Sequence, residues 1–133
     1  MGTELTYLAC SAGLCAFMWV PYVLARLASW GLAATVGYPE TPPNVPSWAR
    51  RLQRAHNNMV ENLVPFAALV LVAHAADVSS GMTVFGAALF FYARFAHALV
   101  YTLGIPWFRT LAFVGGYLGM LLILVALINS SYI

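Results

Sequence analysis

Charged side chains are scarce in this sequence of 133 residues: they make up 8% of it, whereas hydrophobic residues make up 62%. Soluble domains carry about 25% charged residues, so this composition excludes an ordinary soluble protein. Lysine is missing altogether, because all six basic residues are arginine, and the net charge is only +2. Membrane topology accounts for the arginines, as argued below, so we expect no nucleic acid partner.

Cysteine is scarce as well, and the common catalytic motifs are missing. Cys10 and Cys15 are five residues apart in an apolar segment, on different faces of a helix, so they form neither a metal pair nor a redox pair. The three histidines are scattered without a second carboxylate at ligand spacing, so we expect no metal site. No Ser/His/Asp pattern or phosphate-binding loop is recognisable.

Long apolar segments are abundant, and four of them reach the length of about 20 residues that crosses a bilayer. They cover residues 5–25, 57–76, 82–103 and 110–128. Because the connections are short, the sequence predicts a single domain over residues 1–133: an all-α, integral membrane four-helix bundle. The first span follows Glu4 without a basic leader, so we expect it to stay in the mature protein. The GGYLG segment of the last span is suited to close helix contact.

The distribution of arginines predicts the orientation in the membrane. Five of them lie in or beside the first and third connections: Arg26, Arg50, Arg51, Arg54 and Arg109. Glu4 and Asp77 lie at the opposite ends of the spans. The positive-inside rule therefore places both connections in the cytoplasm and both termini outside.

Turn and cap residues mark the connections. Four prolines between residues 31 and 48 predict an irregular loop, after which Ser47 is expected to cap the second membrane helix. Asp77 or Ser79 is expected to cap the third helix, and Pro106 suits the first turn of the fourth.

The second helix carries an unusual stripe of polar residues. Arg54, Asn58 and Glu61 are spaced i, i+4, i+7, which places a guanidinium, an amide and a carboxylate on one face. A carboxylate is costly in hydrocarbon, so Glu61 must face a partner or a water-filled cavity. Pro65 lies four residues later, where it removes the backbone hydrogen bond to the Glu61 carbonyl. The stripe therefore faces the protein interior or a binding site.

The third helix repeats this arrangement with Arg94, His97 and Tyr101. Arg94 is the only arginine well inside a span, which suggests a functional site. The alternative is an ion pair with Glu61 that holds two helices together, and both interpretations predict contact between these residues. We expect Glu61 to pair with Arg54 or Arg94. Together the stripes indicate a site near the cytoplasmic side for a small, polyanionic, hydrogen-bonding ligand next to lipid.

The segment RAHNNMVENLVPF, residues 54–66, resembles the second-helix signature of the MAPEG family, the membrane-associated proteins of eicosanoid and glutathione metabolism. The segment ARFAHALVYTLGIPWFRTLAFVGGY, residues 93–117, supports the resemblance. Both segments are most similar to the microsomal glutathione transferase branch and its bacterial relatives.

The resemblance implies a homotrimer of four-helix protomers in a bacterial inner membrane, with glutathione as co-substrate between neighbouring subunits near the cytoplasmic face. It implies that Arg109 activates the thiolate as the catalytic residue. The implied binding residues include one that reaches the tripeptide from a neighbouring subunit, Arg26, and six others: Arg54, Asn58, Glu61, Arg94, His97 and Tyr101.

Three features depart from the leukotriene synthases of that family. Asn62 and His97 stand where those enzymes have tyrosines, and Arg109 follows Tyr101 by eight residues rather than seven. These departures argue against leukotriene synthesis. We therefore expect a glutathione-dependent transferase or peroxidase that acts on hydrophobic electrophiles. The alternative is a structural or regulatory membrane subunit without enzymatic activity. A four-span multidrug transporter is disfavoured because the first span has no carboxylate.

Overall fold

The structure, a computed structural model, describes residues 1–131 and is built from helices alone over that range. The helices are α1 (Thr3–Phe17), α2 (Trp19–Trp30), α3 (Leu32–Val36), α4 (Ser47–Ala75), α5 (Gly81–Leu103) and α6 (Pro106–Ser131). Four stretches are long and apolar enough to cross a membrane: Thr3–Trp30, Ser47–Ala75, Gly81–Leu103 and Pro106–Ser131. The chain is an integral, multi-pass membrane protein with the predicted all-α four-helix fold.

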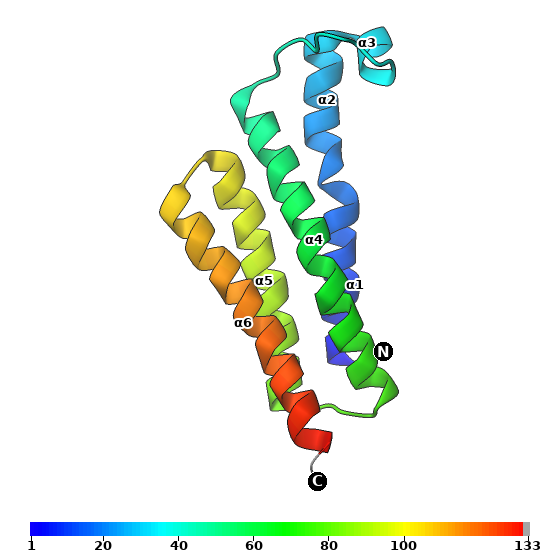
Figure 1. Cartoon of the computed structure of the whole chain (residues 1–133), viewed down its shortest axis with the longest axis vertical. Coiled ribbons are helices and arrows are strands. Elements are labelled where there is room, and N and C mark those ends of the chain that lie inside the picture. Colours follow the sequence, from blue (N-terminus) through cyan, green and yellow to red (C-terminus); the bar gives the residue numbers. More distant parts are fainter. Residues whose placement is uncertain (132–133) are drawn as a thin grey trace.

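The helices run alternately up and down (Figure 1). Helices α1 and α2 form one column, α4 lies beside it, and α5 and α6 form a hairpin next to α4. Both termini lie at one end of the bundle, whereas α3 and the α5–α6 turn lie toward the other. The two polar connections expected in the cytoplasm therefore share one end, although which side of the membrane it faces stays a prediction.

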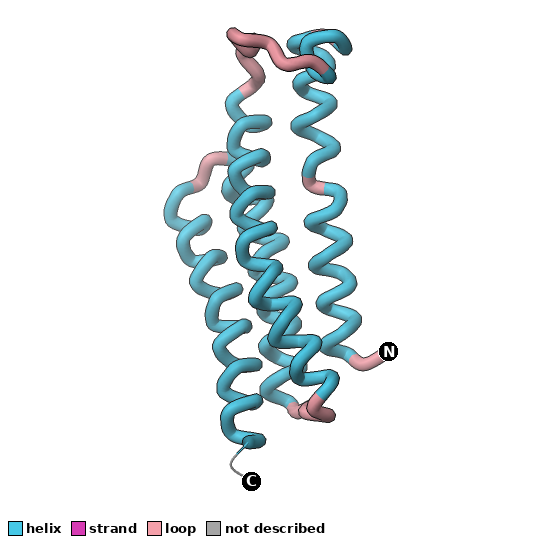
Figure 2. Tube along the Cα trace, turned by 45° about the vertical axis from the view of Figure 1, so that its right-hand side comes forward, coloured by secondary structure: helices cyan, strands magenta, loops and turns pink. Residues whose placement is uncertain are grey.

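The first membrane column is interrupted between α1 and α2 (Figure 2). Pro21 has no backbone N–H to donate to the Phe17 carbonyl four residues earlier, and α1 ends at Phe17. Beyond α2, Gly31 adopts φ 79° and the chain enters α3. The prediction of an irregular loop from residue 31 onward was wrong for Leu32–Val36, because the first proline of that segment comes only at Pro39.

Two of the predicted helix caps were wrong. Pro46 takes the N-cap position of α4 with φ −55° and ψ 146°, so Ser47 is the first helical residue rather than the cap. Ser80, not Asp77 or Ser79, caps α5, because its side chain and that of Thr83 each accept from the other's backbone N–H.

The start of α6 agrees with the sequence. The helix begins at Pro106, as predicted, where the missing backbone N–H costs nothing. The turn before it uses Gly104, whose φ of 79° ends α5 in the left-handed conformation. The short turn places the last residues of α5 next to the first residues of α6, where the candidate site lies.

The interior of the bundle is built from aromatic stacking and close backbone contact. Phe66 of α4 and Phe90 of α5 are fully buried and stack with ring centroids 3.8 Å apart. Helices α5 and α6 touch at glycines: a Cβ on Gly119 would lie 2.5 Å from the Gly86 carbonyl oxygen. These contacts hold α5 between α4 and α6 and fix the height at which its polar residues meet the other two helices.

Candidate functional site

Arg94 is the most deeply buried charged side chain described, with 2% of its surface exposed. Its Nη2 donates a hydrogen bond of 2.6 Å to Oδ1 of Asn58, which joins α5 to α4. Gly116 of α6 makes room for the aliphatic part of Arg94, because a Cβ there would lie 3.0 Å from Arg94 Cδ. The guanidinium lies 5.9 Å from the Phe113 ring centroid. Three helices therefore determine where this charge sits.

Asn58 is oriented by a second amide. Asn62 Nδ2 donates to the Asn58 backbone carbonyl at 2.8 Å and lies 3.4 Å from Asn58 Oδ1. The Asn58 side-chain oxygen thus accepts from both Arg94 and Asn62. Its amide nitrogen has no such partner in residues 1–131 and stays available as a donor.

A pocket of about 380 Å³ opens next to this amide. It is lined by residues of α4, α5 and α6, and we call it the polar pocket: Asn58, His97, Tyr101, Arg109, Thr110 and Phe113. His97 is 2% exposed and lies edge-on to Tyr101, with ring centroids 5.4 Å apart. The Arg109 guanidinium lies over the Tyr101 ring at 5.0 Å. A cation and several hydrogen-bonding groups therefore converge on one opening.

A smaller hollow of about 160 Å³ shares Tyr101 and Arg109 with the polar pocket and adds Arg51 of α4. Arg51 Nε donates to the Thr102 backbone carbonyl at 2.9 Å, near the end of α5. Its guanidinium carbon would lie 3.3 Å from a Cβ on Gly104, so the glycine also leaves space for this side chain. Two arginines from different helices thus flank Tyr101 at the same end of the bundle.

An apolar groove of about 370 Å³ adjoins the polar pocket. We call it the α4–α6 groove; its lining residues include Asn62, Pro65, Leu69, Phe113, Tyr117 and Met120. Phe113 belongs to both openings, and Asn62 connects the groove to the oriented amide of Asn58. The polar pocket therefore continues into an apolar groove between two membrane-spanning helices.

The structure brings five of the eight predicted site residues together. Four line the polar pocket and the fifth lies behind it through its bond to Asn58: Asn58, His97, Tyr101, Arg109 and Arg94. Arg26 does not reach the pocket in its own chain. It donates to Gln53 Oε1 at 2.6 Å and lies over the Tyr22 and Trp30 rings.

The expected ion pair of Glu61 with an arginine is absent within residues 1–131, so that prediction was wrong for the single chain. Arg94 binds the Asn58 amide instead, one turn away from Glu61. Arg54 and Glu61 are both exposed on α4. The structure therefore does not support the interpretation that Arg94 and Glu61 form a purely structural ion pair. Arg94 still joins two helices through Asn58.

Sequence reasoning missed three contributors to this region, Arg51, Asn62 and Phe113. It predicted close helix contact for the GGYLG segment, which contains Gly116, but not that Gly116 would contact Arg94. Asn62 had a usable signal, since it lies four residues after Asn58 on the same helix, a spacing at which side chains meet. The sequence explains Arg51 by membrane topology alone. No three His, Cys, Asp or Glu side chains converge to hold a metal ion anywhere in residues 1–131. Arginines, amides and aromatic groups therefore supply the chemistry of this site.

Comparison with known proteins relates the whole region to one family. The model of the MAPEG family matches residues 8–129, nearly the whole chain. No curated protein matches the chain. The match includes every residue that lines the polar pocket and the α4–α6 groove.

Proposed function

Because the chain belongs to the MAPEG family, we propose that it is a glutathione-dependent transferase of the microsomal type. In this proposal it joins the glutathione thiolate to hydrophobic electrophiles, or reduces lipid hydroperoxides. The observation that supports it best is the junction at Phe113, where a pocket containing Arg109 and Tyr101 meets an apolar groove. Such a junction suits a reaction between a polar thiol and a substrate dissolved in the membrane.

Arg109 is the residue we assign to the thiolate. A free thiol has a pKa of about 8.5, so only a small fraction is ionised at neutral pH. A guanidinium in a partly desolvated pocket stabilises the anion, lowers the pKa of the bound thiol and increases the reactive fraction. Tyr101 lies beneath this guanidinium and restricts its position. We expect the glutathione sulfur to lie between Arg109 and the mouth of the α4–α6 groove.

The transfer step needs no further reagent. The thiolate sulfur forms a bond to the electrophilic carbon, and the leaving group departs with its electron pair. With a lipid hydroperoxide, the thiolate attacks the terminal oxygen, the O–O bond breaks, and the products are glutathione sulfenic acid and an alkoxide, which takes a proton from water to become the alcohol. A second glutathione thiol then attacks the sulfenic sulfur, its S–OH bond breaks, and the disulfide and water form, so that two glutathione molecules supply the two electrons.

The Asn58 amide nitrogen is the group we assign to the peptide part of glutathione. Its oxygen is occupied by Arg94 and Asn62, which leaves the nitrogen as a donor toward the pocket. Arg94 then acts as a positioning residue, because it orients the amide from behind. His97, also at the pocket wall, would restrict the shape of the bound tripeptide.

The remaining predicted binding residues favour a homotrimer in which glutathione lies between subunits. Arg54 and Glu61 are exposed on α4, where a ligand held against a neighbouring copy would meet them. Arg26 binds Gln53 and does not line the polar pocket of its own chain, and we propose that it serves the pocket of a neighbour. We propose a bacterial inner membrane as the location, with the arginine-rich end in the cytoplasm, where the cell keeps its thiol pool.

Replacing Arg109 by leucine tests the assignment. We expect the pKa of bound glutathione to rise and turnover to fall about ten-fold or more, as for the loss of one electrostatic contact to a reacting anion, while glutathione binding weakens little. Thiolate absorbance of the bound tripeptide, recorded against pH, measures this directly. Arg50→Leu is the matched control, because Arg50 is exposed and lines neither the polar pocket nor the α4–α6 groove. Identical titration curves for Arg109→Leu and wild type would show that Arg109 does not stabilise the thiolate.

A non-enzymatic membrane subunit is the second candidate, because the bond between Arg94 and Asn58 also ties two helices together. Titrating the purified protein with glutathione while recording thiolate absorbance separates the two functions. A transferase should show saturable thiolate formation near neutral pH. A structural subunit should show the absorbance of free glutathione at every concentration.

A further inference from the structure

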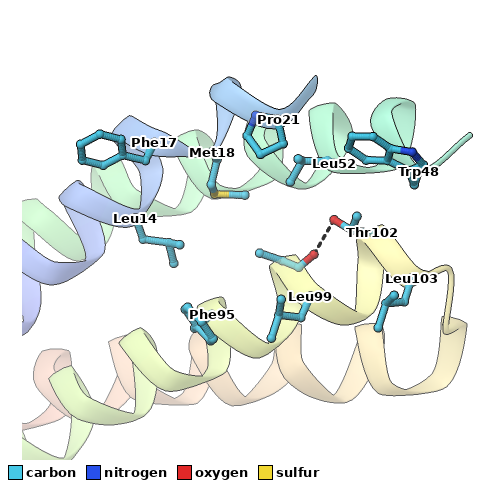
Figure 3. A pocket seen from close by; sticks show the side chains of 11 residues that line it. Leu14, Phe17, Met18, Pro21, Trp48, Leu52, Phe95, Leu99, Thr102 and Leu103 are labelled. Atoms are coloured by element: carbon cyan, nitrogen blue, oxygen red, sulfur yellow. Dashed lines mark hydrogen bonds between the residues drawn. The ribbon is translucent and has the colours of Figure 1, made fainter. Parts of the chain in front are cut away.

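A larger apolar pocket of about 400 Å³ lies on another side of α5, where α1, α2, α4 and α5 meet (Figure 3). We call it the α1–α5 pocket; its walls include Leu14, Met18, Leu52, Phe95, Leu99 and Trp48. The one hydroxyl among its lining residues, that of Thr102, already donates to the Ala98 carbonyl at 2.7 Å. The pocket therefore offers an apolar interior of the size that small-molecule sites have, about 300–1,000 Å³.

The interruption between α1 and α2 shapes this pocket. Met18, at the break, and Pro21, which causes it, both line the walls, and Figure 3 shows them opposite α5. The rim is open, because Phe17 is 74% exposed, Leu99 54% and Leu103 68%. Apolar side chains of a membrane-spanning helix that no other helix covers face hydrocarbon. In the single chain the pocket is thus continuous with an uncovered apolar surface.

The pocket is separate from the proposed reaction site. It shares no lining residue with the polar pocket or with the α4–α6 groove. Helix α5 lies between them, with Arg94 and His97 buried on one face and Phe95 and Leu99 exposed on the other. Within one chain, a molecule in the α1–α5 pocket lies on the opposite face of α5 from the polar pocket that contains Arg109, so we do not assign it as the electrophile of the transfer reaction.

One end of the α1–α5 pocket coincides with the arginine-rich end of the bundle. Trp48 and Leu52 belong to the first two turns of α4, and Thr102 to the last turn of α5. Between them Arg51 binds the Thr102 carbonyl through Nε, and the exposed Arg50 precedes it. Basic residues at this depth attract anionic headgroups. An occupant with an apolar chain and a negatively charged head would match both parts of the site.

We propose that the α1–α5 pocket binds one acyl chain of an anionic phospholipid, whose headgroup lies against Arg51. Trp48 lies at the level where the chain meets the head, a depth that tryptophan favours in membranes. The bound acyl chain would fill the space between α5 and the interruption of the first membrane column. Arg51 also lines the small hollow beside Tyr101 and Arg109. The test is therefore made without glutathione, and its outcome does not depend on the transferase proposal.

Quenching of Trp48 fluorescence by brominated lipid tests the site. The full chain, with Trp19, Trp30 and Trp107 replaced by phenylalanine, is reconstituted in phosphatidylcholine vesicles that contain either brominated phosphatidylglycerol or brominated phosphatidylcholine at equal mole fraction. We expect the anionic lipid to quench Trp48 with about five-fold higher relative association, the preference that one arginine near a lipid headgroup supplies. Arg51→Gln should make the two brominated lipids equal while both still quench.

Two pocket-filling variants provide the control. Ala98→Leu occupies the interior, and Leu99→Phe narrows the rim at a position exposed enough to tolerate the change. Each should reduce quenching by the anionic lipid to the level of the neutral one. Equal quenching by both lipids in the parent protein would mean ordinary boundary lipid and would overturn the proposal. So would the absence of quenching by either lipid, because a second copy of the chain would then cover the pocket, and so would selective quenching that survives both filling variants.

Discussion

The two faces of α5 are both rich in apolar residues, yet they are packed in opposite ways. One face, which we call the inner face, is buried against α4 and α6; it carries two polar residues, Arg94 and His97, together with Gly86 and Phe90. The other, which we call the outer face, carries exposed large apolar residues: Phe95, Leu99 and Leu103. Hydrophobicity does not separate them, because lipid solvates apolar side chains as well as a protein core does. Small and polar residues mark the interior of this bundle.

The physical reason is that helix association in a bilayer depends on close packing and hydrogen bonds rather than on the exclusion of water. On the inner face, Gly86 and Gly119 let two backbones touch, and Phe90 stacks on Phe66. On the outer face α1 also contacts α5, but near the interruption between α1 and α2 the packing leaves a pocket of about 400 Å³. Paired substitutions on the two faces test this contrast.

The strongest test compares two phenylalanines of the same helix. Phe90 is 0% exposed on the inner face, whereas Phe95 is 46% exposed on the outer face. Phe90→Ala should lower the free energy of unfolding by about 3–5 kcal/mol, because it leaves a cavity and removes the stack on Phe66. Phe95→Ala should cost less than about 1 kcal/mol, because lipid replaces the lost contacts. Unfolding by sodium dodecyl sulfate, followed by circular dichroism, measures both; equal losses would contradict the assignment of the two faces.

The second test removes the partner of the buried charge. Asn58→Leu leaves every donor of the Arg94 guanidinium unpaired in a buried position, which should cost about 2–3 kcal/mol of stability. Asn57→Leu is the control, since Asn57 is the same residue type one position earlier and is exposed. The detergent unfolding titration applies again. If the two variants unfold together, the bond from Arg94 to Asn58 does not hold α4 to α5.

The third test moves Arg94 without changing its charge. Gly116→Ala places a Cβ 3.0 Å from Arg94 Cδ, so the arginine must shift, and overpacking of this kind costs about 1–3 kcal/mol. Gly115→Ala brings its Cβ only to 3.4 Å from Ala93 Cβ, an ordinary contact. We expect the first variant alone to weaken glutathione binding, by about ten-fold, in isothermal titration calorimetry. Unchanged binding in Gly116→Ala would mean that the position of Arg94 does not control the polar pocket.

Much of the fold could be predicted from sequence, because hydrophobic run length and proline placement act locally. Four long apolar helices were expected and are present, and α6 begins at Pro106 as predicted. Local rules failed where alternatives lay close together: Ser79 and Ser80 both suit a helix cap, and only the reciprocal bond with Thr83 selects Ser80.

The candidate site was harder to predict, because its contacts depend on the vertical register between helices. Periodicity placed Arg54, Asn58 and Glu61 on one face of α4, but it does not say which of them lies level with Arg94. That register follows from the glycine contact of α5 with α6 and from the stack of Phe66 on Phe90. Charge complementarity favoured Glu61 as the partner, whereas the register selects the Asn58 amide.

The smallest expected change in stability concerns Glu61, which makes no hydrogen bond with the buried Arg94. Its carboxylate is exposed on α4 and has no ion pair within residues 1–131. Glu61→Gln should therefore alter the free energy of unfolding by no more than about 0.5 kcal/mol, the usual range for an exposed position without partners. The same variant should weaken glutathione binding by about ten- to a hundred-fold, because a charge-assisted hydrogen bond to the ligand's ammonium group contributes about 1.5–3 kcal/mol.

The comparison of Glu61→Gln with Asn58→Leu separates binding from architecture. Both residues belong to the stripe on α4, but only Asn58 contacts Arg94 in the chain. Glu61→Gln should lose binding and keep stability, whereas Asn58→Leu should lose both. Calorimetric titration with glutathione and the detergent unfolding curve, measured on the same preparations, decide between them. A Glu61→Gln protein that binds glutathione normally but dissociates into single chains would assign Glu61 to a contact between subunits and remove it from the binding site.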